Sequence, residues 1–173
     1  MPRRVETEVK LAIASPRSAA RRLRQLGFRL RRRRQLEISW IFDDARGSLR
    51  RAGRLLRLRR RGATWMLTAK GPRRPGRYKI RPEVELPLPA GGDIVSLLAQ
   101  LGLRPILQYR RYRTVFADAR GEAGLDETSI GCFLELEGPP RWIDRTARAV
   151  GYAPRDYILR SYPDLFARRR AKS

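Results

Sequence analysis

The chain has 173 residues, with 40 lysines and arginines against 17 acidic residues, for a formal net charge of +23. This length suits one domain that closes its own core, and no apolar run reaches the roughly 18 residues of a membrane span. The absence of histidine and the single cysteine, Cys132, exclude an internal disulfide, a histidine-ligated zinc site and a Cys–His nucleophile. We expect one domain over residues 1–173, with no signal peptide and no membrane anchor, in the cytoplasm.

The positive charge favours polyanionic partners, because such a field concentrates phosphate-bearing ligands and speeds their association. Nucleic acid, long polyphosphate and nucleotides all qualify as partners of this basic surface. Only four of the 40 basic residues are lysines, a bias expected of a GC-rich genome, so part of the charge can be compositional. The four arginines at residues 31–34 read as a solvated face, with a nucleic-acid patch as the alternative.

The first predicted strand covers Val5–Leu11. In an extended strand, side chains alternate between the two faces, so Glu6, Glu8 and Lys10 share one face while aliphatic residues share the other. Like charges two residues apart repel, and a divalent cation with its anionic ligand would compensate both signs. The alternative is the solvated outer face of an edge strand.

Helices and further strands follow along the chain. Helices are expected over residues 16–26, 93–101 and 142–150, with a short one after Ser161. Strands are expected over residues 36–42, in a hairpin within 53–70, and over 78–86, 109–117 and 131–137. Pro82 cannot donate to a ladder and indicates an edge strand or a bulge. Residues from about 167 to 173 are expected to be disordered.

At least six of these strands carry charges of both signs on one face and aliphatic residues on the other. The exposed face of an open sheet would more often hold threonine, serine and glutamine. The pattern favours an α+β fold in which a closed antiparallel β-barrel has a polar, charged interior and amphipathic helices cover its outside. An open sheet with one wet face remains the alternative.

The acidic residues on the strand faces point to metal chemistry. Carboxylates are hard oxygen ligands, and in a chain without histidine they favour Mg²⁺ or Mn²⁺ held together with substrate phosphates. Basic residues on the same faces could bind those phosphates. The acids are Glu6, Glu8, Glu83, Glu85, Asp126, Glu135 and Glu137, and the bases are Lys10, Arg57, Arg59, Lys70, Arg81, Arg111 and Arg113. Phosphoryl transfer commonly divides the work between metal and cationic side chains in this way.

Eight short motifs occur in order between residues 6 and 137. The chain reads Glu6-Thr7-Glu8-Val9-Lys10, then Ile41-Phe42-Asp43-Asp44, Gly53-Arg54-Leu55-Leu56-Arg57-Leu58-Arg59 and Leu67-Thr68-Ala69-Lys70-Gly71-Pro72. It continues with Arg81-Pro82-Glu83-Val84-Glu85, Arg111-Tyr112-Arg113, Leu125-Asp126 and Glu135-Leu136-Glu137. Together these motifs resemble the CYTH superfamily, also called the triphosphate tunnel metalloenzymes, which includes class IV adenylyl cyclases, thiamine triphosphatases and inorganic tripolyphosphatases.

The resemblance implies an eight-stranded antiparallel tunnel that binds a divalent metal and a triphosphate. The metal and water-activating side would comprise Glu6, Glu8, Asp126, Glu135 and Glu137, with Glu6, Glu8 and Lys10 as catalytic residues. The phosphate side would comprise Lys10, Arg57, Arg59, Lys70, Arg81, Arg111 and Arg113. Glu83 and Glu85 would join either the metal shell or a supporting salt-bridge network, the second being preferred for Glu85. Arg111 stands where lysine is common, which removes a group able to lose a proton near neutral pH.

Three functions compete. The first is a metal-dependent triphosphatase acting on inorganic tripolyphosphate, thiamine triphosphate or a nucleoside triphosphate, favoured by the two E-x-E pairs. The second is a class IV adenylyl cyclase converting ATP to cyclic AMP and pyrophosphate, favoured by the Arg160–Phe166 segment, which is similar to the tail of cyclase-type members. The third is a polyphosphate or nucleic-acid binding module without turnover, against which the retained acids argue. A homodimer is expected from the resemblance alone.

Overall fold

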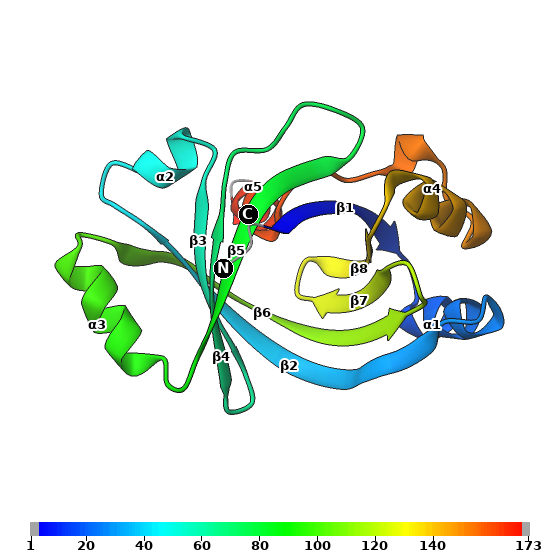
Figure 1. The fold of residues 1–173 in the computed structure, drawn as a ribbon, viewed down its shortest axis with the longest axis horizontal. Coiled ribbons are helices and arrows are strands. Elements are labelled where there is room, and N and C mark those ends of the chain that lie inside the picture. Colours follow the sequence, from blue (N-terminus) through cyan, green and yellow to red (C-terminus); the bar gives the residue numbers. More distant parts are fainter. Residues whose placement is uncertain (1–3, 171–173) are drawn as a thin grey trace. The chain divides into compact units, whose positions relative to one another are not determined.

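The structure is a computed structural model that describes residues 4–170. Its strands are β1 (Arg4–Ile13), β2 (Arg29–Asp43), β3 (Leu55–Arg61), β4 (Thr64–Lys70), β5 (Lys79–Leu88), β6 (Arg104–Ala117), β7 (Glu122–Thr128) and β8 (Gly131–Glu137) (Figure 1). Its helices are α1 (Pro16–Gln25), α2 (Ser48–Arg51), α3 (Gly92–Gln100), α4 (Pro140–Ala149) and α5 (Tyr162–Arg170), with a 3₁₀ turn, η1 (Pro154–Asp156). The strands close in the hydrogen-bonded order β1-β5-β4-β3-β2-β6-β7-β8. This order confirms the predicted closed antiparallel barrel of eight strands.

Several elements differ from the sequence prediction. Strand β2 includes the arginine run at residues 31–34, because a strand is held by its neighbours even where its own residues show no apolar alternation. The expected loop at residues 43–47 leads into the short helix α2. The edge-strand interpretation of Pro82 is wrong, since β5 lies between β1 and β4 in the closed order.

The C-terminal helix is longer than expected. Residues 167–170, expected to be disordered, belong to α5, whereas residues 171–173 lie outside the described part of the chain. The backbone N–H of Ser161 donates to the Asp164 carboxylate at 3.1 Å, and that of Asp164 donates to the Ser161 hydroxyl at 3.4 Å. Such reciprocal bonds satisfy donors that the first turn of a helix leaves unpaired, which explains why a helix begins here.

Contacts within the chain divide it into two compact units. The first unit comprises the stretch ending at Val5, Leu36–Arg74 and Arg81–Arg110, and the second comprises Glu6–Gln35, Pro75–Ile80 and the stretch from Arg111 onward. The chain passes from one unit to the other within β1, β2, β5 and β6. The predicted single domain over residues 1–173 stays a prediction.

In the first unit, β2, β3, β4 and β5 pair in sequence as antiparallel neighbours. Its core is centred on Phe42, Leu58 and Leu98, the last of which comes from α3. Leu58 faces this core, so the alternation of a strand turns its neighbours Arg57 and Arg59 to the opposite face. Helix α3 thus covers the apolar face, and the charged face of these strands lies on the other side.

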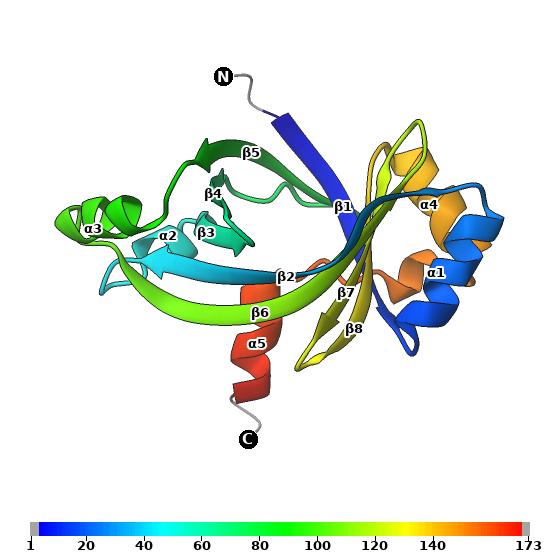
Figure 2. The ribbon, with the colours of Figure 1, turned by 90° about the horizontal axis from the view of Figure 1, so that it is seen from below.

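In the second unit, helices α1 and α4 lie next to β7 and β8 (Figure 2). Leu23 of α1 and Ile143 of α4 are fully buried against apolar strand residues that include Leu11 and Leu134. These strand residues alternate with charged ones, so the charged face of β1, β7 and β8 points away from the two helices. The prediction that helices cover the apolar faces is therefore confirmed within each unit.

Candidate active site

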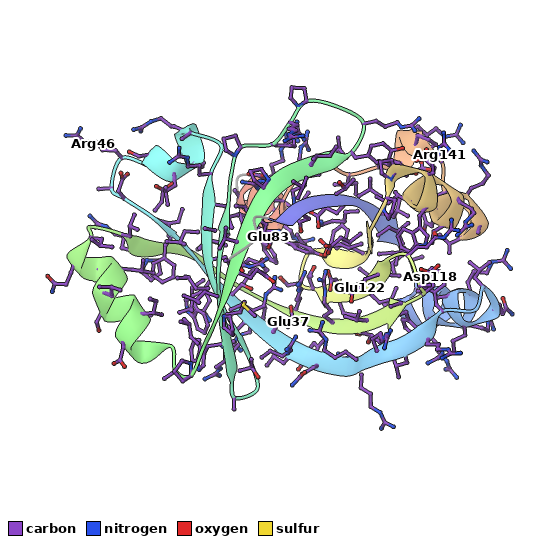
Figure 3. The ribbon with its side chains drawn as sticks, viewed as in Figure 1. Glu37, Arg46, Glu83, Asp118, Glu122 and Arg141 are labelled. Carbon is purple, nitrogen blue, oxygen red and sulfur yellow. The ribbon has the colours of Figure 1, made fainter. Side chains whose placement is uncertain are left out.

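Charged residues of the second unit form rows across neighbouring strands. Where β1 pairs with β8, Glu8 lies opposite Glu137, and Lys10 lies opposite Glu135. Where β7 pairs with β8, Glu122 lies on the other side of Glu137; Figure 3 labels Glu122 at the start of β7. Like charges directly opposite one another on neighbouring strands are destabilising. The carboxylate row of Glu8, Glu137 and Glu122 therefore needs positive charge from side chains or a bound cation.

Asp126 lies at the centre of a connected group of charged residues. We call this group the Asp126 cluster, and it consists of Lys10, Arg111, Arg113, Asp126, Glu135 and Tyr162. The fully buried carboxylate of Asp126 accepts hydrogen bonds from Arg111 at 3.0 Å and from Arg113 Nε at 2.6 Å. Glu135 accepts hydrogen bonds from Lys10 Nζ at 2.5 Å and from Arg113. Each of these carboxylates has partners of opposite sign, without which burying the charge would cost several kcal/mol.

Burial and charge pairing act in opposite directions on the ionisation of this cluster. Burial alone would raise the pKa of Asp126, but the guanidinium groups of Arg111 and Arg113 outweigh it and hold this pKa below its usual value. For Lys10, burial is the larger effect and lowers the pKa to about 8, against the attraction of Glu8. At neutral pH the cluster therefore holds an ionised aspartate and a lysine that loses its proton more readily than an exposed one.

Tyr162, the first residue of α5, brings the C-terminal segment into the cluster. Its hydroxyl donates to Asp126 Oδ2 at 2.6 Å, and its ring centre lies 4.4 Å from Lys10 Nζ and 5.3 Å from the guanidinium carbon of Arg111. Burial and the negative charge of Asp126 raise the pKa of Tyr162 well above its usual value. The hydroxyl thus stays protonated and acts as a donor. Tyr162 is not among the site residues predicted from the sequence.

A further ion pair of the second unit joins Glu8 to Lys79, the first residue of β5. Nζ of Lys79 donates to Oε1 of Glu8, and both side chains are 8% exposed. Glu6, two residues before Glu8 on the same face of β1, is also buried. Like Tyr162, Lys79 is absent from the predicted site residues.

In the first unit, Arg57 and Glu85 are joined through Thr68. The Thr68 hydroxyl accepts a hydrogen bond from Arg57 at 3.2 Å and donates one to Glu85 at 3.0 Å, and the two charged groups lie 3.6 Å apart. Burial opposes ionisation of Glu85, but Arg57 and the Thr68 hydroxyl lower its pKa overall. Nε of Arg57 is buried and has no hydrogen-bond partner within the described residues. This donor is directed to a place where an anionic oxygen could accept it.

Two more ion pairs lie on the charged face of the first unit. Arg59 Nε is 3.5 Å from Glu37, which is 1% exposed, and Lys70 Nζ is 3.2 Å from Glu83. Figure 3 labels Glu37 on β2 and Glu83 on β5. Glu37 is a buried acid that the predicted site does not include. The contacts of Glu83 and Glu85 correspond to the supporting salt-bridge network rather than to a metal shell.

Arg81 makes a different set of contacts. Its Nε donates to the backbone carbonyl of Gly71 at 2.7 Å, and its NH2 donates to that of Gly53 at 2.9 Å and to that of Lys70 at 3.4 Å. Three carbonyl acceptors tie β5 to the segments before β3 and after β4. These contacts favour a structural role for Arg81, and its predicted phosphate contact stays a prediction.

The chemistry of the acids fits a divalent metal. Glu6, Glu8 and Glu137 offer carboxylate oxygens, which Mg²⁺ and Mn²⁺ prefer, and the register brings two of them side by side. Within residues 4–170, however, no three acidic or cysteine side chains converge as a group that could hold a metal ion. Since acids of this face contact lysine and arginine, a bound metal would have to replace such cations.

The predicted site residues fall into two sets. The second unit holds Glu6, Glu8, Lys10, Arg111, Arg113, Asp126, Glu135 and Glu137, and the first unit holds Arg57, Arg59, Lys70, Arg81, Glu83 and Glu85. Five of the second set meet in the Asp126 cluster. The metal, phosphate and catalytic roles assigned to both sets stay predictions.

Comparison with known proteins agrees with the fold. Residues 4–161 match the family model of the CYTH domain. A candidate adenylate cyclase of Methanocaldococcus jannaschii is 26% identical over 134 residues, which cover 77% of this chain and 76% of the relative. The structure of a candidate adenylate cyclase of Vibrio parahaemolyticus aligns with a TM-score of 0.82 at 18% identity, covering 96% of this chain and 99% of the other.

A candidate adenylyl cyclase of Hippeastrum, described as having a dominant triphosphatase activity, aligns with a TM-score of 0.71 at 23% identity, covering 94% of this chain and 95% of the other. These comparisons lend no support to the expected nucleic-acid partner or homodimer. Among the described residues, no helix is both long enough and apolar enough to cross a membrane. Because the family model spans most of the chain, from β1 to the start of α5, this protein belongs to the CYTH domain family.

Proposed function

We propose that this protein is a divalent-metal-dependent triphosphatase that acts on inorganic tripolyphosphate, thiamine triphosphate or a nucleoside triphosphate. CYTH proteins are typically enzymes and are generally metal-dependent. The observation that carries the proposal is the strand register, which sets the opposed pair Glu8 and Glu137 one row from the Lys10–Glu135 pair. A site that only bound polyanions would gain nothing from carboxylates beside its cations, because they repel phosphate.

The second unit supplies groups for both halves of the reaction. We assign metal binding to Glu6, Glu8, Asp126, Glu135 and Glu137. A bound Mg²⁺ or Mn²⁺ would neutralise phosphate charge and make water more acidic. Lys10, Arg111 and Arg113 are the proposed phosphate ligands, since guanidinium groups bind phosphate oxygens in pairs and lysine acts as a point charge.

Hydrolysis then needs a base for the attacking water. The water oxygen bonds to the terminal phosphorus, the bridging P–O bond breaks, and the diphosphate leaves with the bridging oxygen. A carboxylate oxygen of Glu6 or Glu8 accepts the proton that the water loses. Arg111 and Arg113 compensate the charge that moves onto the leaving oxygens, as cationic side chains do in phosphoryl transfer.

Residues of the first unit are proposed to add phosphate contacts. Arg57, Arg59 and Lys70 are cations on one face of β3 and β4, and each is paired with an acid. The buried Nε of Arg57, which lacks a hydrogen-bond partner in the described structure, is a donor that a phosphate oxygen would satisfy. Glu83 and Glu85 are proposed to hold these cations in place.

A class IV adenylyl cyclase is the second candidate function. Its support is the C-terminal motif around Tyr162, which reaches the Asp126 cluster, together with the adenylate cyclase names of relatives from Methanocaldococcus jannaschii and Vibrio parahaemolyticus. The Hippeastrum protein, with its dominant triphosphatase activity, shows that a cyclase name and a triphosphatase activity occur together in one protein. We therefore place hydrolysis first.

Product analysis separates the two functions. The purified protein is given tripolyphosphate, thiamine triphosphate or ATP with Mg²⁺ or Mn²⁺, and orthophosphate, pyrophosphate and cyclic AMP are measured. We expect orthophosphate, lost on chelation with EDTA and in Glu6→Gln. Glu127→Gln is the matched control, since Glu127 lies on the opposite face of β7 and pairs with Arg34 at 2.8 Å. Pyrophosphate with cyclic AMP would establish the cyclase instead, and turnover unaffected by Glu6→Gln would refute the assigned site.

A further inference from the structure

Lys79 occupies a position in the second unit that the proposed function leaves without a role. Its Nζ donates to Oε1 of Glu8, and both side chains are almost fully buried. It is one of four lysines in a chain whose other cations are arginines. A buried lysine that contacts a proposed metal ligand requires an explanation beyond solubility.

The register explains why Glu8 needs this cation. Glu8 lies opposite Glu137, which in turn lies opposite Glu122. Opposed like charges are destabilising, and Glu8 is only 6% exposed, so water compensates little of its charge. In the metal-free protein, the ammonium group of Lys79 neutralises the buried end of this carboxylate row.

A divalent metal on Glu8 would compete with Lys79 for the same oxygen atoms. Two cations on one carboxylate repel each other, so Lys79 has to leave Oε1 when a metal takes its place. The ammonium group would then be a buried charge without its partner, a costly state. Its four-carbon chain is flexible, and a phosphate brought in with the metal would be the anion at hand.

We propose that Lys79 is an exchange cation: it neutralises Glu8 in the metal-free protein and moves to a substrate phosphate when Glu8 binds metal. This inference rests on the proposed function, because it takes Glu8 as a metal ligand and a triphosphate as the substrate. It adds Lys79 to the substrate-binding residues, and it predicts that metal and substrate strengthen each other's binding through this one side chain.

Metal binding without substrate is the first test. Mn²⁺ affinity is measured by the loss of the free-ion electron paramagnetic resonance signal for wild type, Lys79→Met, Lys79→Arg and Arg77→Met. Arg77→Met is the matched control, because it removes the same charge two residues away from an exposed side chain that pairs with Asp144. We expect Lys79→Met to bind Mn²⁺ about tenfold more tightly, and Lys79→Arg and Arg77→Met to stay within about twofold of wild type.

Substrate binding should change in the opposite direction. With saturating Mn²⁺, the non-hydrolysable imido analogue of tripolyphosphate is titrated calorimetrically, and we expect about tenfold weaker binding by Lys79→Met, with recovery in Lys79→Arg. An unchanged Mn²⁺ affinity in Lys79→Met, or an equal gain in Arg77→Met, would overturn the proposal. If only the melting temperature changes, Lys79 is structural and the proposal is also wrong.

A measurement on wild type covers the case in which Lys79→Met does not fold. The ¹⁵N-labelled ammonium signal of Lys79 is recorded by NMR, assigned with Lys79→Arg, before and after addition of Mg²⁺. We expect a signal protected from exchange by the Glu8 contact, and loss of that protection with Mg²⁺; protection that survives saturating Mg²⁺ would overturn the exchange. Mn²⁺ binding with the expected shifts but no phosphate release would refute the triphosphatase alone, whereas a wild type that binds no Mn²⁺ would refute both.

Discussion

Replacing Tyr162 with phenylalanine tests whether α5 holds the central acid of the Asp126 cluster. The hydroxyl donates to the fully buried carboxylate at 2.6 Å, and hydrogen bonds to charged groups contribute about 1.5–3 kcal/mol to stability. Asp126 keeps its two arginine partners, so we expect a loss at the lower end, about 1.5 kcal/mol. In a chain of this length, 1 kcal/mol corresponds to about 2–4 °C, so the melting temperature should fall by about 3–6 °C.

The substitution isolates the hydroxyl because the ring keeps its other neighbours. Phe133 meets the Tyr162 ring edge-on, with centres 5.7 Å apart, and two cations of the cluster lie over it. Tyr157→Phe is the matched control. The Tyr157 hydroxyl donates to Asp144 at 2.9 Å, also a tyrosine–aspartate bond but outside the candidate site.

Activity separates a positioning role from a purely structural one. If Tyr162 orients Asp126, we expect kcat of Tyr162→Phe to fall about tenfold, which corresponds to about 1.4 kcal/mol, with little change in KM. Tyr157→Phe should lose stability and keep its kcat. Calorimetry and steady-state phosphate release measure both quantities. An unchanged melting temperature and kcat in Tyr162→Phe would refute this reasoning, and an equal loss of kcat in Tyr157→Phe would point to general destabilisation.

Three further predictions concern packing, pH and substrate binding. Gly121→Ala should lose about 1–3 kcal/mol in urea unfolding, because its Cβ would lie 2.6 Å from a backbone oxygen and 2.8 Å from a buried tryptophan ring; Gly92→Ala, whose Cβ meets no described atom within 4 Å, should not. Burial opposes ionisation of Asp118, but hydrogen bonds lower its pKa overall, so this stabilisation is present above the unfolded pKa and is lost as pH falls through the folded one. Urea unfolding from pH 6 to 3 should therefore show a shallower loss for Asp118→Asn, and parallel curves would contradict the assignment. Arg57→Lys should raise KM several-fold, since lysine lacks the guanidinium fork, whereas Arg60→Lys, on the exposed face of β3, should not; equal KM values would argue against the phosphate contact.

Much of the fold could be predicted because strand faces differ so strongly in this chain. Residues such as Val9 and Leu11 alternate with charged ones, and a period of two is direct evidence for a strand. The arginine run at residues 31–34 has no such period, because side chains on both faces of that part of β2 are largely exposed. Its strand conformation depends on neighbouring strands far along the chain. Helix α2, at four residues, is too short to show a helical period.

The candidate site was predictable to the extent that its residues lie on those alternating strands. Lys79 and Tyr162 could not be predicted in this way. Lys79 follows a loop of arginine, proline and glycine, and only its contact with Glu8, 71 residues earlier, marks it as a site residue. Tyr162 meets Asp126 across 36 residues. Contacts of this kind are set by tertiary structure, and a single sequence carries no periodic signal for them.

The ion pairs explain why so basic a chain keeps acids on its strand faces. A buried set of arginines alone would repel itself and would have no counter-charge in the free protein. The carboxylates of Asp126 and Glu135 supply that counter-charge and allow Arg111 and Arg113 to be held in place before any ligand arrives. In the proposed complex, metal would replace cations on the acids and phosphate would replace acids on the cations. Each buried charge would then keep a partner of opposite sign in both states, so the same acids serve the folding of the free protein and the chemistry of the bound one.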